Sequence, residues 1–520
     1  HDILTNIIFF FISIFIFIFS VGPEKETLSS IGVGVLWTLL LLSSTLSLRK
    51  FYQDDLDSGN LFLIHMNGFS YELIVILKTL SHVLFVQIPF LISIPIGSIL
   101  MGISSQQTYS LIISFSIGLR TATQTVSSRR LGQKKLNHCG VALRNGALLS
   151  LIYALPVSFF GYFFSENIST LLLNDKEVAG LAKDYISFAF IGVWFTSTSF
   201  VFQGFYTGVE KTKIHMKVTI VSNILNVYLN AGFIYGSTGV KEFFSGTSLS
   251  FLSYVWTVFD FPALGVKGAA VATVIASLFM MVFYFFMLFD KKIKDPFKVF
   301  SAKLSKETLV KQIKLAVPQG AQEVFTMSGY VLLYKIVGII GIIELAATEI
   351  VFTILQTSFM PAAGIGQACA TLVGKHMGEK KIKKAEISIH ESARLSLLVM
   401  GSVGVLFIVF PTNIINLFTT EKEVVYFGVL ALRLAGFLQI IDSIGMTLWF
   451  ALSGAGNTIY PSVVESLLVW LYFLPGSYYF GVVLGYGFIA PWLFFGSYLL
   501  FFAAAMVWKV KQGDWKLIKI

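Results

Sequence analysis

Two stretches of this 520-residue chain repeat each other at a constant offset of 246 residues. The segment GLRTATQTVSSRRLGQKKL, which begins at Gly118, aligns without a gap with GIGQACATLVGKHMGEKKI, which begins at Gly364. The same offset places Gly208 of the YTGVEKT motif on Gly454 of the LSGAGNT motif. A register that persists from Gly118 to Thr212 indicates an internal duplication, which constrains the fold more than any local pattern does. In a membrane protein, paired halves are typical of a transport pathway at the repeat interface.

The composition is that of a membrane protein and excludes a soluble one. Hydrophobic residues make up 55% of the chain, aromatic residues 15% and charged residues only 13%, and the mean hydropathy is +0.78. We count about 14 runs long enough to cross about 30 Å of hydrocarbon as α-helices, which satisfy their own backbone hydrogen bonds in lipid. These runs begin near Asn6, Ile31, Ser70, Gln107, Val141, Tyr185, Ile214, Leu264, Leu315, Ile343, Ile387, Val424, Tyr460 and Tyr486. We therefore predict an all-α polytopic membrane protein.

Lysine and arginine gather in the loops after even-numbered helices, as expected of cytoplasmic loops. The four richest loops contain Arg129, Arg130, Lys134 and Lys135; Lys211, Lys213 and Lys217; Lys291, Lys292, Lys294 and Lys298; and Lys375, Lys380, Lys381, Lys383 and Lys384. Both termini are therefore predicted to be cytoplasmic. The net charge of +10 is then a signal of topology, and we expect no nucleic-acid partner because the basic residues are dispersed over separate loops.

The sequence contains no recognisable metal or nucleotide motif. Cys139 and Cys369 do not suggest a disulfide or metal framework, and no two of the seven histidines stand four residues apart. The pair Gly374-Lys375 lacks the first glycine of a phosphate loop, and His376 follows it in place of Ser or Thr. We expect no enzymatic activity, no metal and no cofactor. Uphill transport would then need a partner ATPase or an ion gradient, in which one charge crossing 100 mV supplies about 2.3 kcal/mol.

From about Ser116 to Ile520 the chain resembles the multidrug and toxic compound extrusion (MATE) family of cation-coupled efflux transporters. The resemblance rests on the two repeated motifs, on the FYTGVEKT and ALSGAGNT turns, and on the segments LAVPQGAQEVF, NILNVYLNAGFIYG and LGVKGAAVAT. It implies two pseudo-symmetric helical lobes that export drugs or toxic organic compounds by alternating access, in exchange for H+ or Na+. It also implies a multi-pass protein of the bacterial inner membrane, with lipid and a small cationic or amphipathic organic substrate as its partners.

The first hundred residues depart from this family. The offset would begin the first helix of the first lobe at Phe69, but Glu72 stands where the counterpart of Pro318 is required. Residues 8–104 instead resemble the first half of the haem exporter permease of the cytochrome c maturation system. The acidic loop FYQDDLDSG and the following Glu72, Lys78 and His82 carry this resemblance.

The junction of the two resemblances divides the chain into four predicted segments. These are a partial permease of three helices in residues 1–107, a first lobe without its usual first helix in 108–290, a basic cytoplasmic linker in 291–314 and a second lobe in 315–520. The permease resemblance leaves two alternatives to the antiporter. One is a haem exporter permease that works with an ABC-type ATPase, and the other is a non-functional chimera of the two families.

Carboxylates within membrane spans are candidates for function, because each costs about 2.5 to 3.5 kcal/mol on insertion. Asp442 lies 12 residues before Gly454, the spacing at which the resembling transporters place an acidic residue of their second lobe. The resemblance therefore implies that Asp442 binds the coupling cation, and the alternative is a buried aspartate with a structural hydrogen bond to a neighbouring hydroxyl such as that of Ser443. Glu349 and Glu465 are weaker candidates, since either could reach water at an interface.

Glu323 is a second candidate for cation coupling. It follows Pro318 by five residues, whereas the family's glutamate stands nearer eight residues past the proline, at the position of Thr326. One turn of helix separates the two positions, so they share a similar face. Thr326 and Gln439 are candidates for lining the cavity.

Three asparagines on one predicted helix are further cavity-lining candidates. Asn223, Asn226 and Asn230 recur at spacings of three and four, and therefore lie on one helix face. A helix–helix hydrogen bond is the alternative. Beyond this helix the first lobe is 26 residues longer than the second, because Gly265 matches Gly485 at an offset of only 220. The aromatic residues of this insertion are expected to form an interfacial hairpin or helix.

Overall fold

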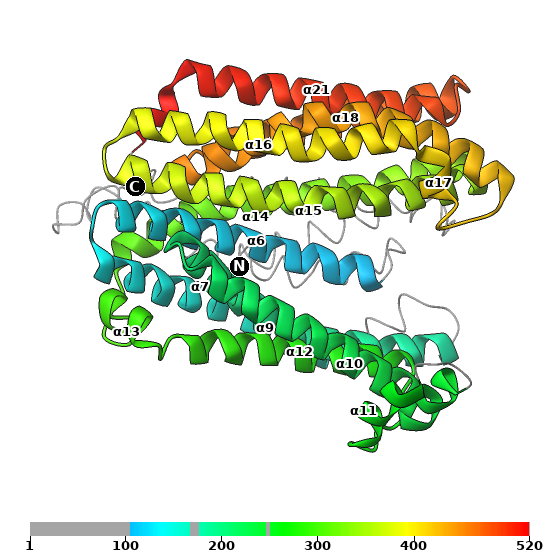
Figure 1. Ribbon diagram of the computed structural model, residues 1–520, viewed down its shortest axis with the longest axis horizontal. Coiled ribbons are helices and arrows are strands. Elements are labelled where there is room, and N and C mark those ends of the chain that lie inside the picture. The colour runs from blue at the N-terminus through cyan, green and yellow to red at the C-terminus, as the bar shows by residue number, and fades with distance from the viewer. Residues whose placement is uncertain (1–104, 167–175, 246–249, 519–520) are drawn as a thin grey trace, which may run out of the picture. The chain divides into compact units, whose positions relative to one another are not determined.

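The computed structural model describes residues 105–166, 176–245 and 250–518 (Figure 1). Within these ranges the chain is helical and has no β-strand. Each apolar run predicted from Gln107 onward corresponds to a long helix, whereas the three runs that begin near Asn6, Ile31 and Ser70 lie outside the described residues. Ten of the described helices are long and apolar enough to cross a membrane, which confirms the predicted fold class.

The helices have the following bounds. The long ones are α6 (Ser105–Gly132), α7 (Leu136–Phe163), α9 (Lys176–Gly208), α10 (Thr212–Phe244), α12 (Val266–Met287), α14 (Lys306–Ile340), α15 (Ile342–Gly378), α16 (Ile382–Val409), α18 (Lys422–Ala455) and α21 (Ile489–Gln512). A composite helix comprises α19 (Ile459–Leu467), η3 (Leu468–Phe473), α20 (Leu474–Tyr478) and η4 (Tyr479–Val483). This composite helix and the long helices other than α6 make up the ten candidate membrane spans of the described residues. The short elements are η2 (Ser250–Ser253), α11 (Tyr254–Thr257), α13 (Lys291–Phe297), α17 (Pro411–Ile415) and η5 (Asp514–Leu517).

Helix α14 begins nine residues before the apolar run that predicted it. Ser305 caps its N-terminus by accepting a hydrogen bond from the backbone N–H of Thr308, and Pro318 lies inside the helix and not at its start. Hydropathy marks only the part of a helix that lies in lipid, so the polar first turns of α14 fall within the predicted linker 291–314. The same segment contains α13, so much of it is helical.

The linker is fixed to α7 by two neighbouring side chains. Arg144 donates from its guanidinium to the backbone carbonyl oxygens of Val299, Phe300 and Ala302. Asn145 donates to the carbonyl oxygen of Ser305 over 2.7 Å and accepts from the Ser305 N–H over 3.3 Å. Because both backbone groups of Ser305 are satisfied by one amide, the N-terminus of α14 is held in place.

Contacts divide the chain into two compact units. Among the described residues, unit 1 comprises 105–113, 150–166, 176–196, 219–245 and 250–281, and unit 2 comprises 114–149, 197–218 and 282–518. In unit 2 the C-terminal helices form a bundle in which α18 packs against α15, α16 and α21 (Figure 1). The second half of α18 is almost fully buried, with Trp449 and Phe450 in the core.

Unit 1 includes the described residues of the insertion. Helix α10 changes direction at Gly236, whose φ of 73° favours glycine. The hydroxyl of Ser237 then donates to the carbonyl oxygens of Trp256 and Phe259, and the Trp256 ring stacks on Tyr228. The described residues of the insertion, which include η2 and α11, are thus folded against α10.

The internal repeat is visible in how equivalent helices end. Lys134 and Lys380, which are equivalent at an offset of 246, both have a φ of 60° just after α6 and α15. In each turn this residue donates to the carbonyl three residues back, and the next residue donates to the carbonyl five back. This is the Schellman arrangement that ends many helices. Glu210 and Gly456, a second equivalent pair, also have positive φ.

The two repeats contact each other reciprocally at one end of unit 2. This basic-loop end carries the turns at 133–135, 209–211, 379–381 and 456–458. A Cβ added at Gly132 would lie 1.9 Å from the carbonyl oxygen of Lys375, and one added at Gly378 would lie 2.3 Å from that of Arg129. Since Arg129 and Lys375 are themselves equivalent, these contacts have the twofold relation that the repeat predicts.

Hydrogen bonds follow the same relation. The hydroxyl of Thr125 donates to the carbonyl oxygen of Ser453 over 3.0 Å. Its equivalent, Thr371, donates to the carbonyl oxygen of Thr207 over 3.3 Å, and Thr207 is the equivalent of Ser453. Each repeat therefore donates one hydroxyl hydrogen bond to a backbone carbonyl of the other repeat, across a pseudo-twofold axis.

The axis passes close to Ser128 and Gly374, which occupy the same position in the two repeats. A Cβ added at Gly374 would lie 2.1 Å from the hydroxyl oxygen of Ser128. The two equivalent residues thus meet each other, and there is no room for a second side chain.

An ion pair and the C-terminal segment also contribute contacts at the basic-loop end. Lys375 forms an ion pair of 2.8 Å with Glu210. Arg129 donates to the carbonyl oxygens of Ala455, over 3.1 Å, and Ile518, over 3.0 Å. Trp515 precedes Ile518 in the same segment, is only 1% exposed and belongs to the core of the C-terminal bundle. The last described residues are therefore part of the contact between repeats.

Candidate functional site

Glu465 lies at the centre of a polar network inside the C-terminal bundle. Its carboxylate accepts hydrogen bonds from the hydroxyl of Thr326 over 3.2 Å and of Tyr498 over 3.4 Å, and from the amide of Gln322. These donors come from α14 and α21, whereas Glu465 is on α19. Glu465 is half-buried. A carboxylate withdrawn from water needs such donors, because its desolvation is otherwise uncompensated.

The network continues from Glu465 toward the basic-loop end. The amide oxygen of Gln322 accepts from Ser462 over 2.8 Å, from Trp449 over 3.3 Å and from Gln319 over 3.2 Å. Gln319 in turn accepts from Ser453 over 3.2 Å. Ser453 is also the residue whose carbonyl oxygen bonds to Thr125 of the first repeat. A continuous chain of hydrogen bonds thus links the carboxylate to the contact between repeats.

Two further predicted carboxylates belong to the same bundle. The charges of Glu323 on α14 and Glu465 on α19 interact electrostatically. Asp442 is carried by α18 of the same bundle. Each of the three carboxylates therefore lies on a helix of the C-terminal bundle. Groups of this kind inside a membrane span are the usual carriers of protons and small cations.

Asp442 does not make the structural hydrogen bond considered as its alternative role. The hydroxyl of Ser443 donates instead to the carbonyl oxygen of Ile440, over 2.7 Å. The Asp442 side chain is half-buried on α18. Its carboxylate is thus not engaged by its sequence neighbour.

The other predicted residues are dispersed. Thr326 belongs to the Glu465 network, whereas Glu349 is exposed on α15. Gln439 is buried and donates to the hydroxyl of Ser358 over 3.1 Å. Its amide oxygen has no hydrogen-bond partner among the described residues.

The three asparagines lie on α10 in unit 1. Asn230 donates to Asn226 over 2.9 Å within the helix, and Asn223 is exposed. The hydrogen bond between Asn230 and Asn226 therefore lies within α10 and does not join two helices.

Sequence reasoning gave Glu465 too little weight and missed Gln319, Gln322 and Tyr498. A signal was present in α14, where Gln319, Gln322 and Thr326 recur at spacings of three and four and so form a polar stripe on an apolar helix. The ring hydroxyl of Tyr498 carries no such signal, because its partner is 33 residues away in sequence.

Arg120 was also missed, although it is a charged residue in α6. Helices α6 and α14 cross closely, since a Cβ added at Gly118 would lie 2.2 Å from the carbonyl oxygen of Ala316 and 2.7 Å from the backbone nitrogen of Gly320. Because Gly320 also meets Phe115 and Gln312 meets Thr123, the two helices run antiparallel. Arg120 and Glu323 therefore lie on opposite sides of this contact, and they form no ion pair within 4.0 Å in the described part of the chain.

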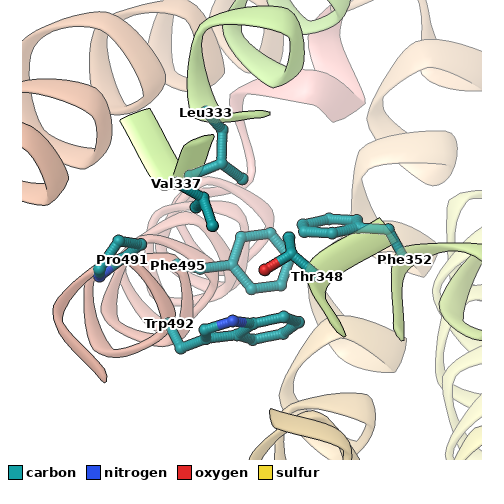
Figure 2. A pocket seen from close by; sticks show the side chains of 7 residues that line it. All are labelled: Leu333, Val337, Thr348, Phe352, Pro491, Trp492 and Phe495. Carbon is teal, nitrogen blue, oxygen red and sulfur yellow. The ribbon is translucent and has the colours of Figure 1, made fainter. Parts of the chain in front are cut away.

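A small pocket in the same bundle is largely apolar (Figure 2). It is lined by Leu333, Val337, Thr348, Phe352, Pro491, Trp492 and Phe495. None of these side chains is charged, so the pocket is distinct from the Glu465 network. Among the described residues no three His, Cys, Asp or Glu side chains are grouped as metal ligands.

Comparisons with known proteins agree with this architecture. The chain is 25% identical over 355 residues to the probable multidrug resistance protein NorM of Thermotoga maritima, covering 67% of this chain and 72% of the relative. It is 23% identical over 419 residues to the probable multidrug resistance protein YoeA of Bacillus subtilis, covering 78% and 85%. Both relatives are matched over most of their length.

Solved structures show the same fold. An outward-facing multidrug resistance MATE family transporter of the MOP superfamily aligns with a TM-score of 0.68 at 18% identity, covering 80% of this chain and 88% of that one. A MATE crystal structure in the straight conformation gives 0.67 at 18% identity, covering 79% and 87%. The MatE family model matches residues 101–231 and 318–479, more than half of the sequence. The chain therefore belongs to the MatE family of multidrug efflux transporters.

Proposed function

We propose that this chain is an antiporter that exports drugs or toxic organic compounds in exchange for H+ or Na+. The observation that carries the proposal is the hydrogen-bonded Glu465 carboxylate within the C-terminal bundle, whose helices also carry Asp442 and Glu323. Carboxylates held in a membrane span bind a proton or a small cation reversibly, and they are expensive to retain without such a role. The multidrug resistance proteins among the relatives supply the substrate class.

Ion binding at Glu465 would change the packing of three helices. The charged carboxylate accepts hydrogen bonds from α14 and α21, whereas a protonated carboxyl donates one and accepts fewer. Loss of the charge therefore favours a different arrangement of Gln322, Thr326 and Tyr498. Because Gln322 connects through Gln319 to Ser453, the change reaches the contact between repeats.

Alternating access supplies the second half of the mechanism. The reciprocal contacts of Thr125 and Thr371, with the Lys375–Glu210 ion pair, hold the repeats together at the basic-loop end. If this end is cytoplasmic, as the loop charges predict, these are contacts that must break for a substrate to enter. The conformational equilibrium then depends on which carboxylates carry an ion.

The test uses the full chain in liposomes with an imposed ion gradient and a fluorescent cationic dye. Asp442→Asn and Glu465→Gln should each lower gradient-driven dye transport at least tenfold without loss of membrane insertion. Glu391→Gln is the matched control, because this exposed glutamate on α16 pairs only with the exposed Arg394. Undiminished coupled transport in both acidic variants would remove the proposed role.

The haem exporter permease resemblance concerns residues outside the described part of the chain, so that alternative stays a prediction. Transport that needs an added ATPase and ignores the gradient would favour it over the antiporter.

A further inference from the structure

The insertion between α10 and α12 exposes a set of large apolar side chains. Five of them, each between 49% and 78% exposed, form what we call the insertion patch: Phe243, Phe251, Val255, Val258 and Phe259. Exposed apolar groups that gather in one segment mark a contact with another protein, a ligand or a membrane. The insertion patch therefore indicates an interaction surface.

Hydrogen bonds hold the insertion in place, so the insertion patch is part of a folded element. The hydroxyl of Ser237 accepts from the Phe261 N–H over 2.9 Å, and the Ser237 N–H donates to the Phe261 carbonyl oxygen over 3.1 Å. The indole N–H of Trp256 donates to the carbonyl oxygen of Tyr228 over 2.8 Å, and the Tyr228 hydroxyl donates to that of Val255 over 3.0 Å. The rings of Trp256 and Phe261 pack into a hydrophobic cluster with α10 and α12, which leaves the insertion patch on the outside.

Helix α10 crosses the membrane before the insertion begins. It starts at Thr212, directly after the basic turn at 209–211, and reaches Gly236 after about 36 Å at about 1.5 Å per residue, which is enough to cross about 30 Å of hydrocarbon. Helix α12 begins at Val266 and leads back to the basic residues at 291–294. The insertion therefore lies at the membrane surface opposite to these basic segments.

The lipid-facing side of α10 leads directly to the insertion. Ile224, Val227 and Tyr235 lie on one face of the helix, and all three are exposed. Because α10 is long and apolar enough to span a membrane, this face contacts lipid. Tyr235 immediately precedes the change of direction at Gly236, and tyrosine rings prefer the level of the lipid headgroups. The chain therefore enters the insertion at the depth where headgroups meet acyl chains.

The charges beside the insertion patch do not favour anionic lipid. Among the described residues of the insertion, Lys241 is the one basic side chain, and Glu242 and Asp260 are acidic; all three are exposed. Their charges sum to −1, whereas membrane surfaces that are bound through charge attract clusters of basic residues. Aromatic and branched apolar side chains enter the headgroup region without such attraction. Contact with the bilayer would therefore depend on apolar area and not on the charge of the lipid.

We propose that the insertion patch anchors the insertion in the bilayer, at the boundary between headgroups and acyl chains of the leaflet opposite the basic turns. Its partner is the lipid surface itself, whatever the charge of the headgroups. This inference goes beyond the proposed antiport, because it concerns how the chain is held in the membrane. The anchor belongs to the first repeat alone, since the equivalent connection of the second repeat is 26 residues shorter.

The test measures the depth of the insertion patch in the full chain, reconstituted in phosphatidylcholine bilayers. Val258→Cys and Phe243→Cys carry a nitroxide label in a chain whose two buried cysteines are replaced by serine. Power saturation then compares collisions with O2, which concentrates in hydrocarbon, and with a nickel chelate, which stays in water. The references are Lys134→Cys, exposed on a basic turn, and Val227→Cys, exposed on α10. The O2-to-nickel ratio at both patch positions should exceed the Lys134→Cys value at least threefold, stay below the Val227→Cys value, and remain the same when phosphatidylglycerol is added.

Matched variants test whether apolar contact holds the insertion patch in lipid. Phe259→Asp should lower the ratio at Phe243→Cys toward the water reference, because a charge at this depth is costly. Glu242→Gln, at an exposed position on α10, is the control and should leave that ratio unchanged. A ratio at Val258→Cys equal to that at Lys134→Cys would place the insertion patch in water and overturn the proposal.

Two further results would also overturn it. Protection of the label from both reagents would show that a second copy of the chain or another protein covers the insertion patch. A raised ratio that appears only with phosphatidylglycerol would show that charge, and not apolar contact, attracts the lipid.

Discussion

Thr125 of the first repeat donates a hydrogen bond of 3.0 Å to the backbone carbonyl oxygen of Ser453 in the second. The equivalent bond runs the other way, from Thr371 to Thr207. Because the acceptors are backbone groups on α9 and α18, these bonds depend on how the helix ends approach and not on the identity of the accepting side chain. Both bonds can form only when the two repeats are in contact at the basic-loop end.

Removing these hydroxyls should favour the open state of that end. Thr125→Ala and Thr371→Ala each delete a bond worth about 0.5 to 1.5 kcal/mol, so each should raise the open-to-closed ratio roughly two- to tenfold. Spin labels at Lys134 and Lys380, which are equivalent and exposed, measure the separation of the two repeats by pulsed electron resonance. The buried Cys139 and Cys369 are first replaced by serine. Identical distance distributions in wild type and both variants would contradict the role of these bonds.

Glycine at position 132 should be required for closure. A Cβ at Gly132 would lie 1.9 Å from the Lys375 carbonyl oxygen, so Gly132→Ala must push α15 away at a cost of about 1 to 3 kcal/mol. We expect a longer distance between the same spin labels and a lower thermal unfolding temperature. Gly401→Ala is the control, since no atom lies within 4 Å of a Cβ added there. A wild-type label distance in Gly132→Ala would show that the helices do not close as described.

Arg129 should anchor the C-terminal segment. Its guanidinium donates to the carbonyl oxygen of Ile518, and Lys516 in the same segment pairs with Glu386 over 2.5 Å. Arg129→Gln should release this segment and speed tryptic cleavage after Lys516 several-fold, as followed by mass spectrometry. Arg394→Gln, on the exposed surface of α16, should cleave at the wild-type rate. Equal rates in all three proteins would exclude the anchoring role.

Asn145 should hold the linker between the repeats. Asn145→Ala leaves the Ser305 N–H without its partner and removes one of the two donors to the Ser305 carbonyl oxygen, which still accepts from the Leu309 N–H. An unpaired buried N–H costs about 1 to 3 kcal/mol. Tryptic cleavage after the exposed Lys303 should become faster, and the unfolding temperature should fall. The control is Asn223→Ala, at an exposed position, which should leave both the cleavage rate and the unfolding temperature unchanged. If the Asn145→Ala variant is cleaved after Lys303 at the wild-type rate, Arg144 alone is sufficient to fix the linker.

The helices and their duplication could be predicted from sequence because both depend on local, repeated signals. Hydropathy located the long helices of the described ranges, and the offset of 246 aligned Lys134 with Lys380, which the structure shows at equivalent helix ends. Helix boundaries were less accurate where a helix continues into water, as at Lys306. The predicted division into segments 1–107, 108–290, 291–314 and 315–520 stays a prediction.

The polar network was harder to predict, because its members are brought together only by packing. Glu465 and Gln322 are 143 residues apart, and nothing near Glu465 in sequence indicates three donors.

Ser128 and Gly374 meet at the pseudo-twofold axis although they occupy one and the same position of the repeat. In a homodimer of a half-length ancestor, such a residue would touch its own copy, so every change there would be made twice and a bulky side chain would be excluded from both copies. In a single chain that restriction does not apply, because one of the two positions can carry a larger side chain when the other carries a smaller one. In this chain the serine hydroxyl occupies the space that a side chain at the equivalent glycine would need.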